Sequence, residues 1–587
     1  MGASRGFCLA VATMIGVVAS AEVLQPADIS CVKIKGYVAD RLEGCVRRHV
    51  EATDVHYLAN VFSSSVETSL WQTEFWGKWM HSAGPFARAM QSDSLLGKIR
   101  ESTAVVLAAQ EPDGYIGNYP KGLRAGEGWD VWGNKYTLLG LLHAYQATGS
   151  REILDGACRL ADCLLDVFGP GKRSLAKSGN FRGLPSCSVL EPIVWLYRET
   201  GDRRYLDFAG YVVSELDAEY GPRLLADSSK PVADRVTDGT IKGSALKSYE
   251  TMSCCQGLLD YFDVAGDQHV FEAVLRNAES IRRDEINLAG GASSSEHWYR
   301  GRDRQTETYV FQQETCVQTT WMRLAGKLLR ETADVKWAEE VERTFYNAYL
   351  GSLGAGNDVF TQYCPLTGTR SRGAYHCRMH TNCCNANGPR GFLVFLENFL
   401  LTDGKAAFLN FYSSGEVSAK LSDGTSVRLE VFTLYPSEGT VHIQNLTERD
   451  GRFALNLRIP AWADGTRVAV NGTAVADVRA GSYLTLDRDW KTGDQVEIAF
   501  PMKTCVHVLN EHVAFTRGPL LLARDRRFGD GDFSETLQRT ILSRRTVDFV
   551  PVAPGGGMWN TFAGLLPLGT HLDNPEAGRP KAVRLCD

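Results

Sequence analysis

The segment YTLLGLLHAYQATGS, residues 136–150, carries apolar residues at helical spacing and then reaches Gly149. A glycine at that point fits the left-handed position that closes a helix. The helical spacing recurs in VLEPIVWLYRETGD, CQGLLDYFDVAGD and TTWMRLAGKLLRETAD, which end at Asp202, Asp267 and Asp334. The first two of these also reach a glycine, Gly201 and Gly266. A second helical pattern follows each break, as in RRYLDFAGYVVSEL, so the sequence predicts a repeated helix hairpin.

The hairpins predict a ring of paired helices. Their breaks fall 52, 65 and 67 residues apart. One hairpin cannot bury its own apolar face, so neighbouring hairpins must stack. We interpret residues 50–400 as an (α/α)6 toroid, within a catalytic domain of residues 22–400 that begins with a strand-like segment. The loops at one end of the inner helices would form the ligand cleft. An open superhelical scaffold of the same hairpins is the alternative.

After residue 400 the apolar period changes to two. SVRLEVFT, TVHIQNL, RFALNLRIP, RVAVNG, YLTLDRDW and QVEIAF alternate apolar and polar positions between turn sequences such as DGTS and NGTA. This pattern predicts an antiparallel β-sandwich over residues 401–505. Residues 506–587 predict a second, small β-rich domain. The early segment SCVKIKGYV is also strand-like and is expected to join one of these sheets.

Length, composition and charge limit the classes of protein. A chain of 587 residues is too long for one ordinary domain. Its 44% hydrophobic and 22% charged residues are typical of globular proteins, and its net charge of −6 offers no basic footprint for nucleic acid. We therefore expect no nucleic-acid partner.

The first 21 residues resemble a signal peptide. Arg5 precedes the apolar run GFCLAVATMIGVV, and Ala19, Ser20 and Ala21 supply small residues before Glu22. We expect export to the periplasm or the medium. No later apolar run is long enough to span a bilayer, so no membrane anchor is expected. A buried N-terminal helix is the alternative interpretation.

Cysteines are numerous but do not form a recognisable disulfide framework. The chain has 15, of which Cys8 would leave with the signal peptide. Two pairs are adjacent in sequence, Cys254-Cys255 and Cys383-Cys384. The first pair has no assigned role. Disulfide connectivity cannot be read from these spacings.

One constellation carries potential chemistry. Glu314 and Cys316 are two residues apart, and Cys383 and Cys384 are adjacent. A carboxylate and three thiols are ligand types that zinc takes tetrahedrally. A structural zinc site, unpaired core cysteines and a catalytic thiolate are all compatible with this pattern.

These residues resemble a known family, the bacterial β-L-arabinofuranosidases. The resemblance is carried by Glu314-Thr315-Cys316, by Cys383-Cys384 with Asn387, and by SSSEHW, which contains Glu296. EPDGYIGNY, RIPAWADGTRVAVNG and RDWKTGDQVEIAFPM are also similar to segments of that family. The resemblance implies an exo-acting, retaining glycoside hydrolase that releases terminal sugars from plant-type polysaccharides or glycans.

The resemblance also implies roles for residues. Glu314, Cys316, Cys383 and Cys384 would bind Zn²⁺. Cys383 would also be the nucleophile, and Glu296 the general acid/base. A retaining glycosidase needs a nucleophile on one face of the sugar and a proton donor on the other. Glu307 is the competing carboxylate for the second role.

The sugar pocket departs from the family. Several histidines expected on the early hairpins are absent, so the pocket is predicted to be altered. The candidate substrate-binding residues are Trp76, Lys78, Trp132, Asn134, Lys135, Ser186, Glu250 and Asn387. For each of these residues the alternative is a purely structural role, in which Trp76 and Trp79 would pack in the core of the toroid. A lysine-containing pocket would suit a sugar acid.

Three rival functions remain at this point. A polysaccharide lyase on the same toroid would use a Tyr or His base and an Arg. A non-catalytic glycan-binding protein would use the zinc only as a structural element. A glycosidase that uses carboxylates alone would resist thiol alkylation and chelators.

Overall fold

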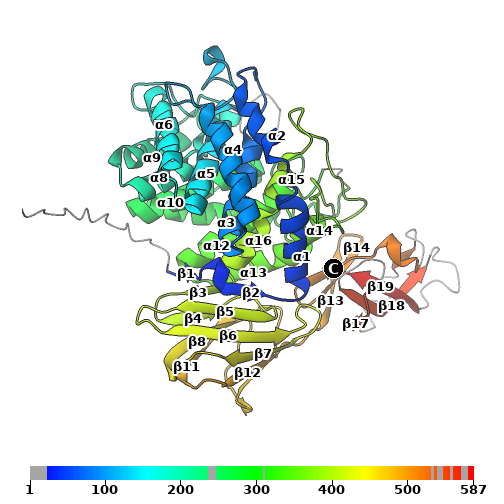
Figure 1. Cartoon of the computed structure of the whole chain (residues 1–587). Helices are drawn as coiled ribbons and strands as arrows, with labels where there is room; N and C mark the ends of the chain where they lie inside the picture. Colours follow the sequence, from blue (N-terminus) through cyan, green and yellow to red (C-terminus); the bar gives the residue numbers. More distant parts are fainter. Residues whose placement is uncertain are drawn as a thin grey trace, which may run out of the picture.

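The computed structural model describes residues 23–235, 246–308, 311–530, 535–537, 547–554, 560–569 and 580–587. The expected signal peptide and Cys8 lie outside these residues. Figure 1 shows a helical domain stacked on a β-sandwich, with a smaller β-rich part beside them. Among the described residues, no helix combines the length and apolar character that crossing a bilayer requires.

Six inner helices form a closed ring. They are α3 (Glu74–Ala89), α5 (Asp130–Thr148), α8 (Leu190–Thr200), α10 (Ser248–Ala265), α12 (Thr315–Thr332) and α16 (Arg390–Glu397). Each contacts the next, and α16 contacts α3, which closes the ring. The closure excludes the open scaffold and confirms the predicted toroid.

Outer helices cover the ring. They are α4 (Asp93–Ala108), α6 (Arg151–Val167), α9 (Arg203–Leu216), α11 (Gln268–Ser280) and α13 (Val335–Thr344), with α1 (Tyr37–Cys45) continuing as the π-helical turn η2 (Val46–Val50) against α3. Burial separates the two layers. Helix α5 buries nearly every residue from Asp130 to Ala144, whereas α6 buries one stripe that includes Ile153, Leu160 and Leu164.

A Gly-Asp pair makes two of the hairpin turns. Gly201 and Gly266 close α8 and α10 at φ of +70° and +69°, where glycine has no Cβ penalty. The aspartates that follow them cap the next helices, because the Asp202 and Asp267 side chains accept from Arg204 N and His269 N. The fourth predicted break differs, since α12 ends at Ala333 with φ +53°.

Short helices connect these elements. They are η1 (Ile29–Cys31), α2 (Val55–Asn60), η3 (Val61–Ser63), η4 (Lys121–Leu123), η5 (Phe181–Gly183), α7 (Leu184–Cys187), η6 (Val232–Asp234), η7 (Ile281–Glu285), η8 (Phe345–Tyr349), α14 (Leu350–Ser352), α15 (Cys383–Asn387) and η9 (Arg526–Phe528). Of these, α15 carries the adjacent cysteines of the candidate site.

The sandwich consists of two sheets. One has the order β10-β9-β12-β7-β6-β5-β2 and the other β1-β3-β4-β8-β11. The strands are β1 (Gln25–Pro26), β2 (Val32–Ile34), β3 (Leu400–Thr402), β4 (Ala406–Leu409), β5 (Gly415–Lys420), β6 (Ser426–Thr433), β7 (Thr440–Asn445), β8 (Gly451–Ile459), β9 (Arg467–Val470), β10 (Thr473–Ala474), β11 (Ser482–Trp490) and β12 (Gln495–Ala499). The predicted alternating segments coincide with β6, β7, β8, β9, β11 and β12. The pairing is antiparallel except between β4 and β8.

The toroid and the sandwich are joined in two ways. The early strand-like segment supplies β2, which pairs with β5, so the chain enters the sandwich before it forms the toroid. A buried ion pair also links the guanidinium of Arg458 on β8 to the carboxylate of Glu342 on α13. Tyr435 Oη donates to the same carboxylate at 2.7 Å.

The C-terminal part is β-rich. β13 (Thr504–Leu509), β14 (His512–Arg517) and β15 (Leu520–Leu522) form one sheet, and β16 (Thr536–Leu537), β17 (Val550–Val552), β18 (Thr561–Gly569) and β19 (Pro580–Cys586) form another. Asn347 of η8 donates to Pro519 O at 3.0 Å, which ties the first sheet to the toroid.

Candidate active site and metal centre

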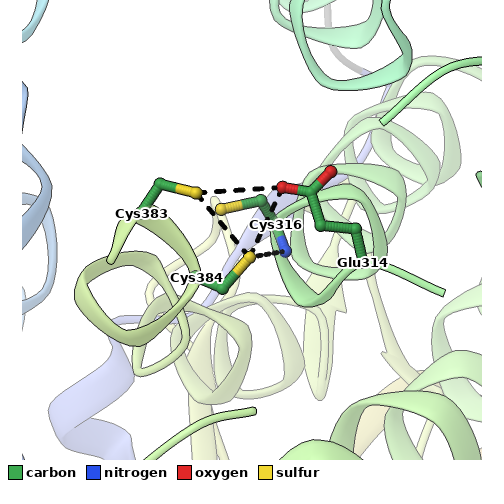
Figure 2. A group of neighbouring side chains, drawn as sticks. All are labelled: Glu314, Cys316, Cys383 and Cys384. Carbon is green, nitrogen blue, oxygen red and sulfur yellow. Dashed lines mark hydrogen bonds between the residues drawn. The ribbon is translucent and has the colours of Figure 1, made fainter. Parts of the chain in front are cut away.

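A carboxylate and three thiols converge at one end of the ring. Glu314 directly precedes α12, Cys316 lies in its first turn, and Cys383 and Cys384 begin α15. Their ligand atoms all lie within 4.8 Å of one another, and all four residues are buried. Figure 2 shows the four side chains pointing toward a common centre. The start of a helix therefore lets both adjacent cysteines face one point.

The donor set fits a tetrahedral metal. Bonds of about 2.3 Å to sulfur and about 2.0 Å to oxygen separate two sulfurs by about 3.8 Å, and a sulfur from an oxygen by about 3.5 Å. The Cys383 and Cys384 Sγ atoms are 3.8 Å apart, and Cys384 Sγ lies 3.4 Å from Glu314 Oε1. Glu314 Oε2 is buried without a hydrogen-bond partner among the described residues. A buried orphan oxygen is costly unless a cation or donor meets it, so the cluster is suited to a metal ion.

Thiolate character concentrates on Cys383. Hydrogen bonds from the Cys316 and Cys384 thiols, and one from His376, hold the pKa of Cys383 well below its usual range. Burial and the nearby charges of Glu296 and Cys383 raise the pKa of Glu314. Cys383 is therefore the thiol best suited to react as a thiolate.

Lys78 on α3 supplies positive charge beside the cluster. Its Nζ lies 3.9 Å from Cys316 Sγ and 2.9 Å from Glu74 Oε1. Although burial opposes the charged form, the negative charges of Cys316 and Glu74 raise the pKa of Lys78 above its usual range. Glu74 in turn accepts from the indole N–H of Trp132.

Glu296 lies in a strained loop next to the cluster. Ser293, Ser295 and Glu296 take φ of +75°, +48° and +68°, a region that side chains rarely adopt and that often marks functional sites. The Glu296 carboxylate forms an ion pair with Lys247 Nζ, and the same nitrogen lies 3.9 Å from Glu250 Oε1. Its charge also contributes to the raised pKa of Glu314, so the two carboxylates lie near each other.

Glu307, the competing carboxylate, lies in a different environment. It forms a surface ion pair with Arg304 at 2.8 Å, and its side chain is 47% exposed. The geometry therefore favours Glu296 over Glu307 for the acid/base role.

Five predicted pocket residues lie around the cluster. Lys78 and Trp132 are described above, and Glu250 contacts Lys247. Lys135 is 1% exposed, with its Nζ 4.6 Å and 4.7 Å from the ring centroids of Trp132 and Tyr136. Asn387 on α15 is also buried, and its Nδ2 has no partner among the described residues.

The other three predicted pocket residues make structural contacts. Asn134 Nδ2 donates to Ile116 O at 3.0 Å, and Ser186 Oγ donates to Ser178 O at 2.8 Å. Trp76 is fully buried and packs edge-on against Phe62, with ring centroids 5.9 Å apart. The structure does not support sugar stacking by Trp76, because no face of its ring is accessible. The structural alternative for this tryptophan is the better account.

The sequence did not single out several other residues near the site. His376 lies in a loop, and its hydrogen bond to Cys383 had no sequence signal. Tyr136 and Tyr249 share a hydrogen bond, and Lys78 Nζ lies 5.3 Å and 4.7 Å from their ring centroids. Lys247 directly precedes α10, and only its ion pair with Glu296 places it at the site. Aromatic residues at helical spacing are typical of a helix core, so the sequence could not distinguish Tyr136 and Tyr249 at the site from ordinary core residues.

Comparisons with known proteins now place the chain. Residues 28–396 match the family model described as the β-L-arabinofuranosidase GH127 catalytic domain, and residues 406–502 match the GH127 middle domain. These matches show that the chain is a glycoside hydrolase, so its substrate is a carbohydrate. The chain belongs to the GH127 family of β-L-arabinofuranosidases.

Relatives support this placement. A non-reducing end β-L-arabinofuranosidase of Bifidobacterium longum is 24% identical, with 86% of this chain and 85% of that protein covered. A GH127 β-arabinofuranosidase structure superposes with a TM-score of 0.78 at 21% identity, covering 96% and 95% of the two chains. A GH127 β-L-arabinofuranosidase structure from Geobacillus stearothermophilus T6 superposes with a TM-score of 0.76 at 19% identity, covering 94% of this chain and 96% of that one. The two structural likenesses show the fold, and the family match carries the enzyme class. This class argues against the lyase and the non-catalytic binding protein.

The remaining cysteines form no disulfide. All fourteen cysteines of the described residues are unpaired. Cys254 and Cys255 lie buried on α10, where burial raises the pKa of both thiols. They are therefore core thiols without nucleophilic character.

Proposed function

We propose that this chain is an exported, zinc-dependent, retaining exo-glycosidase that releases terminal β-L-arabinofuranosyl residues from plant-type polysaccharides or glycans. The observation that carries the proposal is the buried Glu314, Cys316, Cys383 and Cys384 cluster, with ligand atoms within 4.8 Å of one another. The sugar is taken from the name of the B. longum relative. Export rests on the signal-like N-terminal sequence.

Glu314, Cys316, Cys383 and Cys384 would hold the zinc ion. When bound, zinc would keep the thiols ionised near neutral pH and lower the basicity of the sulfur. Lys78, 3.9 Å from Cys316 Sγ, adds a fixed positive charge next to these anionic ligands. Three thiolates and a carboxylate carry more negative charge than a divalent ion neutralises, so a neighbouring ammonium stabilises the ionised set.

The first chemical step transfers the sugar to the protein. Cys383 Sγ attacks the anomeric carbon, and a C–S bond forms as the glycosidic C–O bond breaks. Glu296 donates a proton to the departing oxygen. His376 hydrogen-bonds Cys383 and so helps to hold its sulfur in position.

The second step releases the sugar. The Glu296 carboxylate accepts a proton from water, and the water oxygen attacks the same anomeric carbon. The C–S bond electrons return to Cys383, so two inversions leave the original configuration. Lys247 holds the Glu296 carboxylate through its ion pair and thereby fixes the position of the group that moves the proton.

The structure does not favour a sugar acid as the substrate. The two lysines that prompted this idea are both engaged. Lys78 is paired with Glu74, and Lys135 lies 1% exposed over aromatic rings. Neither offers a free cation to a sugar carboxylate.

Trapping of the covalent intermediate tests the proposal. An arabinofuranoside with an activated phenolic leaving group needs little acid assistance in the first step, whereas release still needs a base. The Glu296→Gln variant should therefore accumulate a pentosyl adduct. Mass spectrometry of the intact protein should find one added pentosyl group, and peptide mapping should locate it on Cys383.

Glu307→Gln is the matched control, because it neutralises the competing carboxylate at the surface. This variant should turn over like the native enzyme without accumulating an adduct. An adduct on a carboxylate, or accumulation in Glu307→Gln instead of Glu296→Gln, would overturn the assignment of roles.

A further inference from the structure

A cavity lies inside the ring, behind the candidate active site. Its volume is about 230 Å³. Each of the six inner helices contributes to its lining, through His81, His143, Trp195, Gln256, Arg323 and Arg390. The cysteine cluster lies at the start of α12, and Thr320, which contacts Arg390, follows Cys316 by four residues on the same helix. The first residue of α12 that lines the cavity is Arg323, which follows Cys316 by seven residues, so the cavity begins about two helical turns beyond the cluster.

Arg390 brings an unbalanced charge into this cavity. The residue is 4% exposed. Its Nη2 donates to Thr320 Oγ1 at 3.0 Å, and its Nε has no hydrogen-bond partner among the described residues. None of the described carboxylates forms an ion pair with it. A buried charge without a counter-ion is costly, so the site calls for an anion.

Other cations of the cavity differ in this respect. Arg323 is paired with Glu191, and Arg198 Nη2 lies 2.7 Å from Asp263 Oδ2. Lys327 lies 3.4 Å from Asp260 Oδ1 and 3.3 Å from Glu331 Oε1. Asp260, Asp263 and Glu331 lie toward the C-terminal ends of α10 and α12. Glu191 lies in the first turn of α8 and forms its ion pair with Arg323, so none of these carboxylates pairs with Arg390.

Two histidines next to Arg390 also lack partners. His81 and His143 are 7% and 8% exposed, with ring centroids 4.5 Å apart. His81 Nδ1 and both ring nitrogens of His143 have no hydrogen-bond partner in the described part of the chain. Burial lowers the pKa of both rings, that of His143 to about 3, so each is neutral and carries one N–H donor.

We propose that this cavity is a binding site for a small oxyanion, held by the Arg390 guanidinium and the N–H groups of His81 and His143. A guanidinium matches the paired oxygens of carboxylates, phosphates and sulfates. The volume admits a small anion with its waters, or a small organic acid. The carboxylates Asp260 and Glu397, which also line the cavity, disfavour larger polyanions. This site is independent of the proposed catalytic chemistry.

Calorimetric titration of the full-length protein tests this inference. The probes are inorganic phosphate, inorganic sulfate and glucuronate, each against sodium chloride of equal ionic strength at constant pH. The expected result is saturable binding of one anion per chain, with a matching rise in Tm. Preference for phosphate or sulfate would assign an inorganic oxyanion, and preference for glucuronate would assign a sugar carboxylate.

Three variants locate the binding. Arg390→Met and His143→Phe should each weaken anion binding at least tenfold. If Arg390→Met does not fold, His143→Phe still tests the site, because it keeps an aromatic ring against Trp195. Arg452→Met, which removes an exposed arginine of the sandwich, should bind as the native protein does. A Cys383→Ala, Cys384→Ala double variant should also bind normally, which separates this cavity from the cluster.

Two results would overturn the proposal. One is the absence of saturable binding for all three anions up to about 10 mM, where a useful site would be occupied. The other is binding that survives unchanged in His143→Phe, or that is lost in the double cysteine variant.

Discussion

At the scale of single residues, Cys383 and Cys384 show how sequence neighbours can serve one site. Adjacent side chains normally point apart, but here the first turn of a short helix directs both sulfurs inward, 3.8 Å from each other. The difference between them comes from their surroundings. Hydrogen bonds lower the pKa of Cys383, whereas burial raises the pKa of Cys384.

Lys135 allows a residue-scale prediction about stability and pH. Burial lowers its pKa to about 8, against about 10.4 in an unfolded chain. Below pH 8 both states carry the charge, and the folded state bears the cost of burying it. Between pH 8 and pH 10.4 the folded state loses the proton first, so the contribution of Lys135 to stability rises with pH.

Lys135→Met should therefore stabilise the protein at pH 7 by on the order of 3 kcal/mol, and the gain should vanish above about pH 10.5. Urea unfolding of both proteins at pH 7, 9 and 10.5 measures the difference. Lys405→Met, at an exposed lysine, should show no such change. A variant that is less stable at pH 7, or a gain independent of pH, would contradict the account.

At the scale of elements, the ends of the inner helices allow a matched pair of tests. Ala333 closes α12 with φ +53°, where residues with a Cβ are strained by about 1–2 kcal/mol. Gly201 closes α8 at φ +70°, and a Cβ added there would meet no atom within 4 Å. Only backbone conformation distinguishes the two substitutions.

Ala333→Gly should raise the free energy of unfolding by about 1 kcal/mol, and Gly201→Ala should lower it by a similar amount. Chemical denaturation of both variants checks the pair. Equal effects of the same sign would show that something other than the left-handed backbone decides these positions.

Local patterns predicted the elements, but not which side chains meet. The Gly-Asp breaks gave the hairpins because glycine closes one helix and aspartate caps the next. Alternation gave β6 to within a residue. Glu-x-Cys and Cys-Cys predicted the cluster because a carboxylate and three thiols are ligand types that zinc takes, although the pattern alone left core cysteines and a catalytic thiolate open. The ion pair of Lys247 with Glu296 spans 49 residues of sequence. Such pairs depend on loop conformation, and loops lack the periodic apolar pattern that predicts helices and strands from sequence.

The sequence did not predict the partners of buried polar side chains either. Asn134 and Ser186 were predicted to bind sugar, yet each meets a backbone carbonyl. His81, His143 and Arg390 lie on different inner helices, and only ring closure brings them to one cavity. Sequence identifies a polar residue on a helix, whereas its partner is decided by packing between helices.

At the scale of the whole molecule, a buried ion pair connects toroid and sandwich. Arg458 and Glu342 are 0% and 3% exposed in their side chains. Arg458→Met would leave the Glu342 charge buried without its cation, so we expect a loss of about 3–5 kcal/mol in stability.

The double variant Arg458→Met, Glu342→Leu removes both charges and should recover part of this loss. Scanning calorimetry measures both variants, and separation of the thermal transition into two would show that the pair couples the domains. An Arg458→Met variant as stable as the native protein would contradict a linking role for the pair.

The central claim is that Glu314, Cys316, Cys383 and Cys384 form a zinc centre in which Cys383 is the nucleophile. The most direct measurement is the zinc content of native, freshly purified protein by elemental analysis, beside a Cys383→Ala, Cys384→Ala double variant and a Cys254→Ala, Cys255→Ala control. We predict about one zinc per chain in the native protein and the control, and loss of both zinc and arabinofuranosidase activity in the double variant. An active native enzyme without zinc, or a double variant that keeps its zinc and its activity, would contradict the account.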